Sequence, residues 1–287
     1  MDEFVPVAEL TETERAVRAA FGAGERCNLA TRSDRKVRAA VLSGLLAGAY
    51  PVGGGLGPAL RLDHAMITGR LDLEGRTVDP VVSLRWCTFD QTPRLTMARL
   101  VGLSLRGCHV PGLRARNLRV ASDLVLEPGF TSTGTVDLTD GTVEGTLRLS
   151  GAVLRRPGGE ALLAARLRVS GSITAVALRA EGEVRLRGAN VGGSIYLSGA
   201  ELRHPDGHAL ESAGLVVAGN LMCDARGGRF HAAGRVVLSG ARIGGDAVLS
   251  GARLDSPVPT ARCWSCRTAR WTTRSCSTPR GCGWTVT

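Results

Sequence analysis

Residues 188–202 read GANVGGSIYLSGAEL, and this stretch contains one short pattern twice. The order Gly-Ala-x-apolar begins at Gly188 and begins again eleven residues later at Gly199. A fixed spacing of this kind is typical of proteins in which each repeat packs on the next along one axis. The question is therefore which structural unit a repeat of eleven residues forms.

The same pattern belongs to a longer repeat that covers much of the chain. Three stretches align without gaps at offsets of 48 and 52 residues, and the segments that follow the first two, 155–173 and 203–221, also align. The chain thus holds a repeat of roughly fifty residues made of units of about eleven. The aligned stretches are 134–154 (GTVDLTDGTVEGTLRLSGAVL), 182–202 (GEVRLRGANVGGSIYLSGAEL) and 234–254 (GRVVLSGARIGGDAVLSGARL).

Apolar residues inside each unit alternate in short pairs, such as Ile195 with Leu197, and alternation indicates strands. The phase slips after each pair, and Gly188, Gly193 and Gly199 stand at the slips. A corner there needs an unusual φ or a close backbone approach, which glycine permits. The pattern predicts a mainly β fold, a right-handed β-helix of roughly eight four-sided coils of about 22–25 residues. A β-sandwich of short strands is the alternative.

The repeat predicts three regions in the chain. Residues 60–254 form the β-helix, residues 1–59 a helical cap for its first coil, and residues 255–287 a tail outside the repeat. Thr11 or Thr13 caps a first helix that ends at Gly22, and Ser33 or Asp34 starts a second helix that runs to Leu46. A separate helical binding module is the alternative for residues 1–59.

Composition narrows the class of protein. Aromatic residues make up only 4% of the 287 residues and Gly numbers 38, which suits a narrow interior with many corners. The net charge of +10 comes from scattered arginines, with Lys36 as the one lysine, so we expect no nucleic-acid partner. No run of 18 apolar residues and no signal peptide is present, which predicts a cytoplasmic protein with reduced cysteines and no transmembrane segment. Cys108 takes an alanine place in the repeat and is expected in the core.

Two inserts carry the only local cluster of chemically active side chains in the repeats. They occupy equivalent places 48 residues apart and should protrude from the same edge of the rod, two coils apart. Their arginines could line an anion-binding strip, and the second insert could hold a metal ion. The remaining interpretation is a plain soluble turn. The residues are Arg155 and Arg156 in the first insert and Arg203, His204, Asp206 and His208 in the second.

The tail offers two further interpretations. Four cysteines give the ligand count of a zinc site, although no strand pattern surrounds them. The other interpretation is a tail that takes no part in the fold, for example the product of a shifted reading frame. The last coil would then keep an open edge, which predicts a homo-oligomer formed through the C-terminal coil. The cysteines are Cys263, Cys266, Cys276 and Cys282.

The run Arg187-Gly188-Ala189-Asn190-Val191 resembles the pentapeptide-repeat proteins, which form four-sided right-handed β-helices. With ITGRLDL upstream, the sequence is similar to a group of actinobacterial β-helical proteins commonly labelled "membrane-associated oxidoreductase". The resemblance covers residues 60–254 and implies the scaffold, and no catalytic residue carries over with it.

The residues contain no nucleotide-binding, nucleophile-elbow or metalloprotease motif, so we expect no cofactor. We therefore expect a non-catalytic β-helical scaffold or interaction module with a protein partner that the sequence does not identify. The alternative is an oxidoreductase-like protein with a site on the flank of the β-helix. Peripheral association with a membrane stays open.

Overall fold

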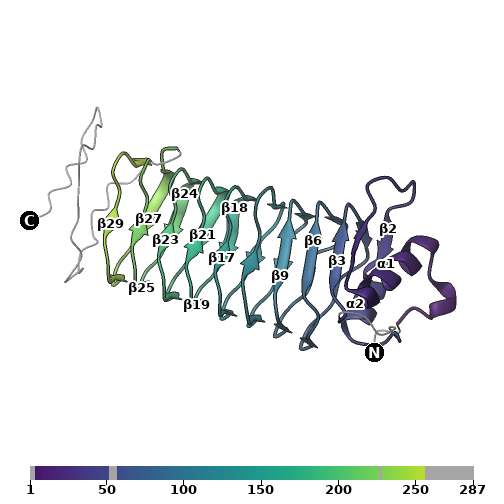
Figure 1. The fold of residues 1–287 in the computed structure, drawn as a ribbon. Coiled ribbons are helices and arrows are strands. Elements are labelled where there is room, and N and C mark those ends of the chain that lie inside the picture. The colour runs from purple at the N-terminus through teal and green to yellow at the C-terminus, as the bar shows by residue number, and fades with distance from the viewer. Residues whose placement is uncertain (1–3, 52–56, 226–227, 256–287) are drawn as a thin grey trace, which may run out of the picture.

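The chain winds into a rod of stacked coils with two helices at its N-terminal end (Figure 1). The computed structural model of the protein describes residues 4–51, 57–225 and 228–255. About eight coils follow one another, and every strand pairs in parallel with the equivalent strand of the next coil. The chain therefore folds as the right-handed β-helix that the repeats predict.

Three sheets run along the rod, and from residue 77 onward each coil contributes one strand to each of them. The first, sheet A, contains β1 (Arg26–Asn28), β3 (Leu60–Asp63), β6 (Val82–Arg85), β9 (Leu103–Arg106), β13 (Leu124–Val125), β17 (Leu147–Arg148), β20 (Ile173–Thr174), β23 (Ile195–Tyr196), β26 (Leu221–Met222) and β29 (Ala247–Val248). Sheet C contains β5 (Thr77–Val78), β8 (Arg99–Leu100), β12 (Arg119–Val120), β16 (Thr142–Val143), β19 (Arg168–Val169), β22 (Asn190–Val191), β25 (Val216–Val217) and β28 (Arg242–Ile243).

Sheet B supplies a second long side and part of a fourth side. Its main path contains β2 (Lys36–Arg38), β4 (Met66–Thr68), β7 (Thr88–Phe89), β10 (His109–Val110), β14 (Thr131–Ser132), β18 (Val153–Leu163), β21 (Arg179–Arg185), β24 (Glu201–Glu211), β27 (His231–Val237) and β30 (Arg253–Asp255). The fourth side begins with the bridges Asp72–Arg94–Arg114 and continues through β11 (Leu113–Arg114), β15 (Val136–Asp137) and the far ends of the four long strands. Each coil is thus four-sided, as predicted.

The interior is a set of apolar columns that run along the rod. In sheet A, the inward residue of each strand pairs with the inward residue of the next coil, which stacks the side chains in register. One column contains Leu60, Val82, Leu103, Leu124, Leu147, Ile173, Ile195, Leu221 and Ala247. Partners in this column are 21 to 26 residues apart, a wider range than the sequence suggests.

The eleven-residue unit is half a coil, and it ends at a corner with left-handed backbone. Two kinds of corner have this backbone. Gly188, with φ 63°, lies just before a strand of sheet C, and Gly199, with φ 69°, lies just after a strand of sheet A. Gly193 instead allows close packing, because a Cβ there would lie 2.9 Å from the Gly171 carbonyl oxygen. Two left-handed corners per coil explain why Gly-Ala-x-apolar recurs every eleven residues.

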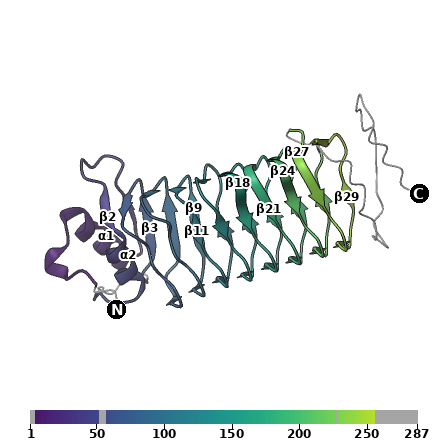
Figure 2. The same ribbon diagram turned by 180° about the vertical axis from the view of Figure 1, so that it is seen from behind.

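Two helices cover the N-terminal end of the rod, as Figures 1 and 2 show. A short 3₁₀ turn, η1 (Val7–Glu9), precedes α1 (Glu12–Ala23), and α2 (Ala39–Leu46) follows β2. Nearly every side chain of α2 is buried, including Val41 and Leu42 at 0% exposure. The predicted cap therefore covers the first coil with apolar surface.

The bounds of both predicted helices need correction. Thr11 caps α1 as predicted, but the helix passes through Gly22 and ends at Ala23. Its C-cap is Gly24, whose φ of 70° is the left-handed conformation of a helix C-terminus. The second helix begins at Ala39 and not at Ser33 or Asp34, because Val37 is buried in β2 and pairs with β4. Strands β1 and β2 extend sheets A and B back into residues 1–59. No helix of the described residues has the length and apolar character needed to cross a membrane.

Candidate functional site

The two inserts lie on the same edge of the rod, as the repeat predicts. They fall within β18 and β24, which are separated in sheet B only by β21. Both strands shift register at the insert, which bulges the chain between sheet B and the fourth side.

The arginines of the inserts do not form a strip of uncompensated positive charge. Arg155 and Arg203 are each paired in register with Glu181, which stands between them on the intervening coil. Arg155 Nε lies 3.8 Å from Glu181 Oε1, and Arg203 Nη2 lies 3.4 Å from Glu201 Oε2. Arg156 folds back over Gly159, where a Cβ would lie 3.1 Å from its Cγ. An anion at this edge would therefore meet alternating charges.

The second insert does not gather its three candidate metal ligands. His204 Nδ1 lies 3.1 Å from the backbone oxygen of His208, so one ring nitrogen already has a partner. Among residues 4–51, 57–225 and 228–255, no three His, Cys, Asp or Glu side chains form a group able to hold a metal ion. The zinc candidates Cys263, Cys266, Cys276 and Cys282 lie outside the described residues.

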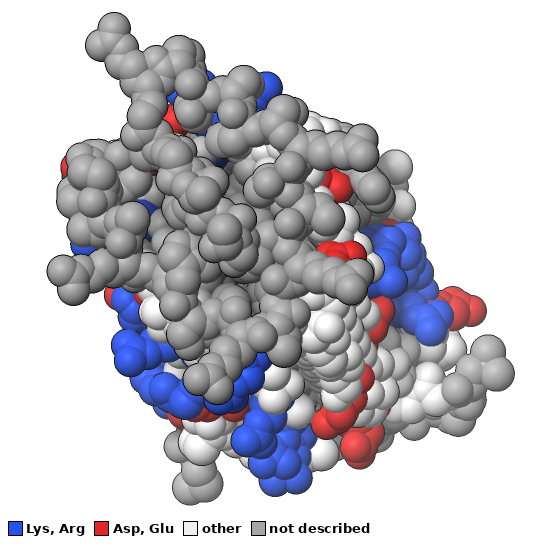
Figure 3. Space-filling view, turned by 90° about the vertical axis from the view of Figure 1, so that its left-hand side faces the viewer, with Lys and Arg blue, Asp and Glu red and all other residues white. Residues whose placement is uncertain are grey.

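Charged side chains on the coils pair mainly with the neighbouring coil. Arg166 binds Asp140 through two hydrogen bonds of 2.6 and 2.7 Å, across a separation of 26 residues. Arg148 contacts Asp123 at 3.2 Å and Glu127 at 3.4 Å on the preceding coil. Seen along the rod from its C-terminal end, groups of Lys and Arg have Asp and Glu beside them (Figure 3). The outer charges thus form ladders between coils.

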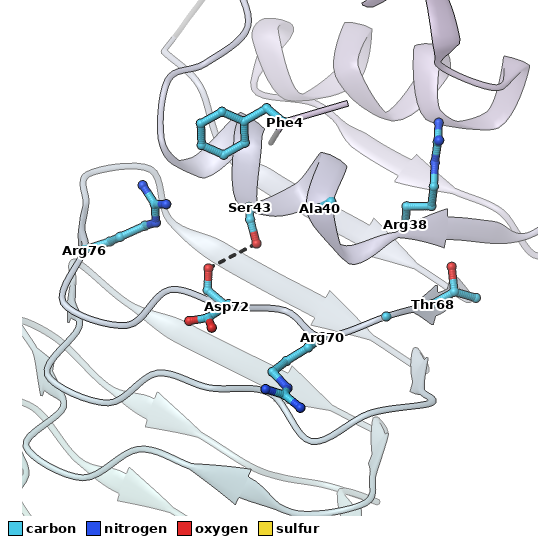
Figure 4. A pocket seen from close by; sticks show the side chains of 9 residues that line it. Phe4, Arg38, Ala40, Ser43, Thr68, Arg70, Asp72 and Arg76 are labelled. Carbon is cyan, nitrogen blue, oxygen red and sulfur yellow. Dashed lines mark hydrogen bonds between the residues drawn. The ribbon is translucent and has the colours of Figure 1, made fainter. Parts of the chain in front are cut away.

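A cavity of about 430 Å³ lies between the cap and the first coil (Figure 4), and we name it the cap–coil pocket. The cap contributes Phe4, Arg38, Ala40 and Ser43, and the first coil contributes Thr68, Gly69, Arg70, Asp72 and Arg76. The Ser43 hydroxyl donates a hydrogen bond of 3.2 Å to the backbone oxygen of Asp72, which ties α2 to the coil beneath it. The pocket is therefore built by both parts of the fold.

Two of the charged side chains around this pocket are already neutralised. Arg38 binds Glu14 through its Nε at 2.8 Å and its Nη2 at 2.6 Å. Burial raises the pKa of Glu14, but hydrogen bonds from Arg38 and Thr11 outweigh burial and leave that pKa below its usual value. The carboxylate of Asp72 lies 3.3 Å from Arg94 of the next coil.

Arg70 and Arg76 have no acidic partner within the described part of the chain. The Arg76 guanidinium lies over the Phe4 ring, 5.6 Å from its centroid, and faces the pocket together with Ser43 and Asp72 (Figure 4). Sequence reasoning missed this group. The signal was present, because Arg76 follows a corner glycine at a place where other coils carry small or apolar residues.

A second feature is an exposed aromatic side chain at the corner between sheets A and B. Trp86 is 54% exposed and stacks on His64, with ring centroids 5.0 Å apart and planes 14° apart. Met66, 44% exposed, pairs in register with Thr88, two residues after Trp86. We name His64, Met66 and Trp86 the Trp86 edge.

The cysteines within the described residues serve the interior. Cys108 is fully buried, as predicted, and stacks beside Cys87 of the preceding coil. Burial raises the pKa of Cys223 to about 12, which keeps this thiol protonated at neutral pH. Cys223 is therefore a core residue and not a nucleophile at neutral pH.

Comparison of the chain with protein-family models, with curated proteins and with solved structures finds no match. The cap–coil pocket and the Trp86 edge are consequently interpreted from their own chemistry.

Proposed function

We propose that the protein is a non-catalytic β-helical interaction module that binds a protein partner through the Trp86 edge. The observation that carries the proposal is the placement of Trp86. A large apolar side chain stands in solvent at a corner where the backbone favours glycine.

Backbone conformation at this corner makes a tryptophan unfavourable for stability alone. Trp86 has φ 50°, whereas equivalent corners on later coils hold Gly107, Gly129 and Gly151. A bulky residue in the left-handed region is strained, and such strain at an exposed position is a reason to look for function. Gly107 leaves room for the indole ring, because a Cβ there would lie 2.6 Å from Trp86 Cδ1.

Exposed large apolar side chains are concentrated on the N-terminal coils of the rod, at several of their corners. Of the large apolar side chains that are exposed, all except Val7 and Tyr196 lie between residues 66 and 101. Tryptophan is enriched among the residues that contribute most to protein interfaces. Several charged side chains of the later coils pair with the neighbouring coil, which suits these coils to be a rigid support for this end.

A photo-cross-linking experiment tests the partner. A photoreactive amino acid replaces Met66 in the full chain, once with Trp86 present and once with Trp86→Ala, and a control carries it at Tyr196, 37% exposed on a distant coil. We expect a discrete protein adduct from position 66 that is lost with Trp86→Ala and absent from position 196. Identical adducts from all three proteins would contradict the proposal.

A second experiment separates the module from an oxidoreductase-like protein. The purified chain is examined for flavin absorbance and for a thermal shift with flavins and nicotinamide nucleotides. We expect neither signal. A flavin that copurifies with the chain would overturn the non-catalytic proposal and favour a redox site on the flank of the β-helix.

A further inference from the structure

We propose that the cap–coil pocket binds a small organic anion, with its carboxylate or phosphate group on Arg76 and an apolar ring or chain against Phe4. This site is separate from the Trp86 edge. It depends on neither the proposed protein partner nor that surface.

The first argument is the position of Arg76 in the coil. Arg99 of the next coil donates its backbone N–H to the Arg76 carbonyl, and the same bond joins Arg119 to Ala98 and continues along the rod. Arg76 therefore begins a column whose later members are buried and carry no charge. These members are Ala98, Leu118, Gly141, Leu167, Ala189, Leu215 and Ala241.

A charged side chain at the head of an apolar column is costly unless something compensates it. The Phe4 ring offers a cation–π contact at 5.6 Å, which is a weak compensation at a half-exposed site. No carboxylate of the described residues pairs with Arg76 or with Arg70. The pocket thus presents one guanidinium group, that of Arg76, whose N–H donors can bind a carboxylate or phosphate in a fork-like geometry.

The second argument is the size and lining of the cavity. A volume of about 430 Å³ lies within the range of small-molecule sites and exceeds the need of a bare inorganic anion. Phe4 and Ala40 supply apolar surface, while the Ser43 hydroxyl and the Arg76 guanidinium supply polar groups. A few polar groups in a partly apolar cavity are the usual composition of a site for an organic ligand.

Four probes separate the contributions in calorimetric titrations of the full chain. Phenyl phosphate and phenylacetate carry both a ring and an anion, inorganic phosphate carries the anion alone, and benzyl alcohol carries the ring alone. We expect one of the two ring-bearing anions to bind tighter than inorganic phosphate, and benzyl alcohol not to bind. The tighter of the two identifies the anionic group. If neither ring-bearing anion binds, the proposal is wrong, and if inorganic phosphate binds as tightly, the role of Phe4 is wrong.

Variants assign the binding to the pocket. Arg76→Ala restores the kind of residue that Ala98 provides in the next coil, so we expect an unchanged or higher melting temperature together with a loss of affinity of about tenfold or more. Arg76→Gln is a second test that keeps a polar side chain at this position and removes its charge, and we expect a similar loss. The control is Arg168→Ala, an exposed arginine of β19 that has no ion pair within the described ranges.

The control decides between a site and a general attraction of anions to a basic protein. We expect Arg168→Ala to bind the tightest probe as the unchanged chain does. An equal loss in Arg76→Ala and Arg168→Ala, or unchanged binding in both Arg76→Ala and Arg76→Gln, would overturn the proposal.

Discussion

Left-handed corners place a conformational demand on single residues of this protein. Many corners hold glycine, but several hold other residues that adopt the same backbone at a cost of about 1 kcal/mol each relative to glycine. These residues are His64, Trp86, Met97, Asn117, Asp140, Arg166 and Ala177. Asn and Asp tolerate the left-handed conformation best. Trp86 and Met97 have bulky side chains that disfavour it, and both are exposed.

A pair of opposite substitutions tests this demand. Gly188 and Ala177 occupy successive corners, with φ 63° and 53°. We expect Gly188→Ala to lower the free energy of unfolding by about 1 kcal/mol, since a new Cβ would only contact Arg166 Cγ at 3.6 Å and the strain lies in the backbone. Ala177→Gly should raise the same quantity by several tenths of a kcal/mol to about 1 kcal/mol. Urea unfolding measures both, and changes of the same sign would contradict the explanation.

At the scale of elements, one carboxylate joins the two parts of the cap. Glu14 accepts a hydrogen bond from the Thr11 N–H at the start of α1, at 3.0 Å, and from the Arg38 N–H at 3.0 Å just before α2. The Arg38 side chain adds two charge-assisted bonds. Glu14 is buried, so these bonds fix α1 against β2 and the first coil.

The lowered pKa of Glu14 predicts a pH dependence of the cap. A carboxyl with a lowered pKa in the folded state stabilises the fold above its unfolded pKa, about 4.3, and that stability is lost as pH falls through the folded pKa. We expect Glu14→Gln to destabilise the cap by about 1–2 kcal/mol at neutral pH. When the pH falls from neutral to about 3, the cap of this variant should lose less stability than the cap of the unchanged chain. Hydrogen exchange of the α1 amides measures this difference.

Glu12→Gln is the matched control on the same helix. The Glu12 side chain is 89% exposed and lies 3.4 Å from Arg32, a surface contact of little energetic value. Its substitution should leave the pH dependence of the α1 amides unchanged. Equal effects of the two substitutions would show that the buried network is not responsible.

The elements also show what could be predicted and why. Alternation placed Leu197 inside and Tyr196 outside, and the structure confirms this with exposures of 3% and 37%. The predicted start of the second helix is too early because Val37 suits both a helix and a strand, and only its pairing with β4 decides between them. The local spacing of apolar residues predicts the strands that form the sides of a coil. It does not predict contacts between segments that are distant in the sequence.

The same limit explains the candidate sites. The repeat register predicts that the inserts lie on one edge. The position of Glu181 between the two arginines depends on the stacking of the intervening coil, which the spacing of the inserts does not specify. Arg76 could be recognised as a charge in an apolar column once the register was known. The cap–coil pocket could not, because Phe4 and Ser43 come from segments whose packing on the coil has no repeat to predict it.

At the scale of the whole molecule, each coil supplies hydrogen-bond partners for the next. The Ile195 N–H donates to the Asn220 carbonyl and the Leu221 N–H to the Asp246 carbonyl, whereas no following coil of the described residues accepts from Ala247. Inward side chains of this last described coil are less shielded from solvent than those of earlier coils. Leu249 and Leu254 are only half-buried, while Leu202 is fully buried. Unpaired strand edges beside apolar side chains favour association with another chain.

We therefore propose that the protein self-associates through its C-terminal coil, and one substitution tests it. Leu249→Lys places a charge among the half-buried apolar residues of that coil, where a second copy would have to bury it. In size-exclusion chromatography with light scattering, we expect the unchanged chain to form oligomers and Leu249→Lys to be monomeric. Val101→Lys makes the same change at an exposed valine near the opposite end and should behave as the unchanged chain does. A monomeric unchanged chain, or oligomers that Val101→Lys disrupts and Leu249→Lys does not, would place the contact elsewhere or remove it.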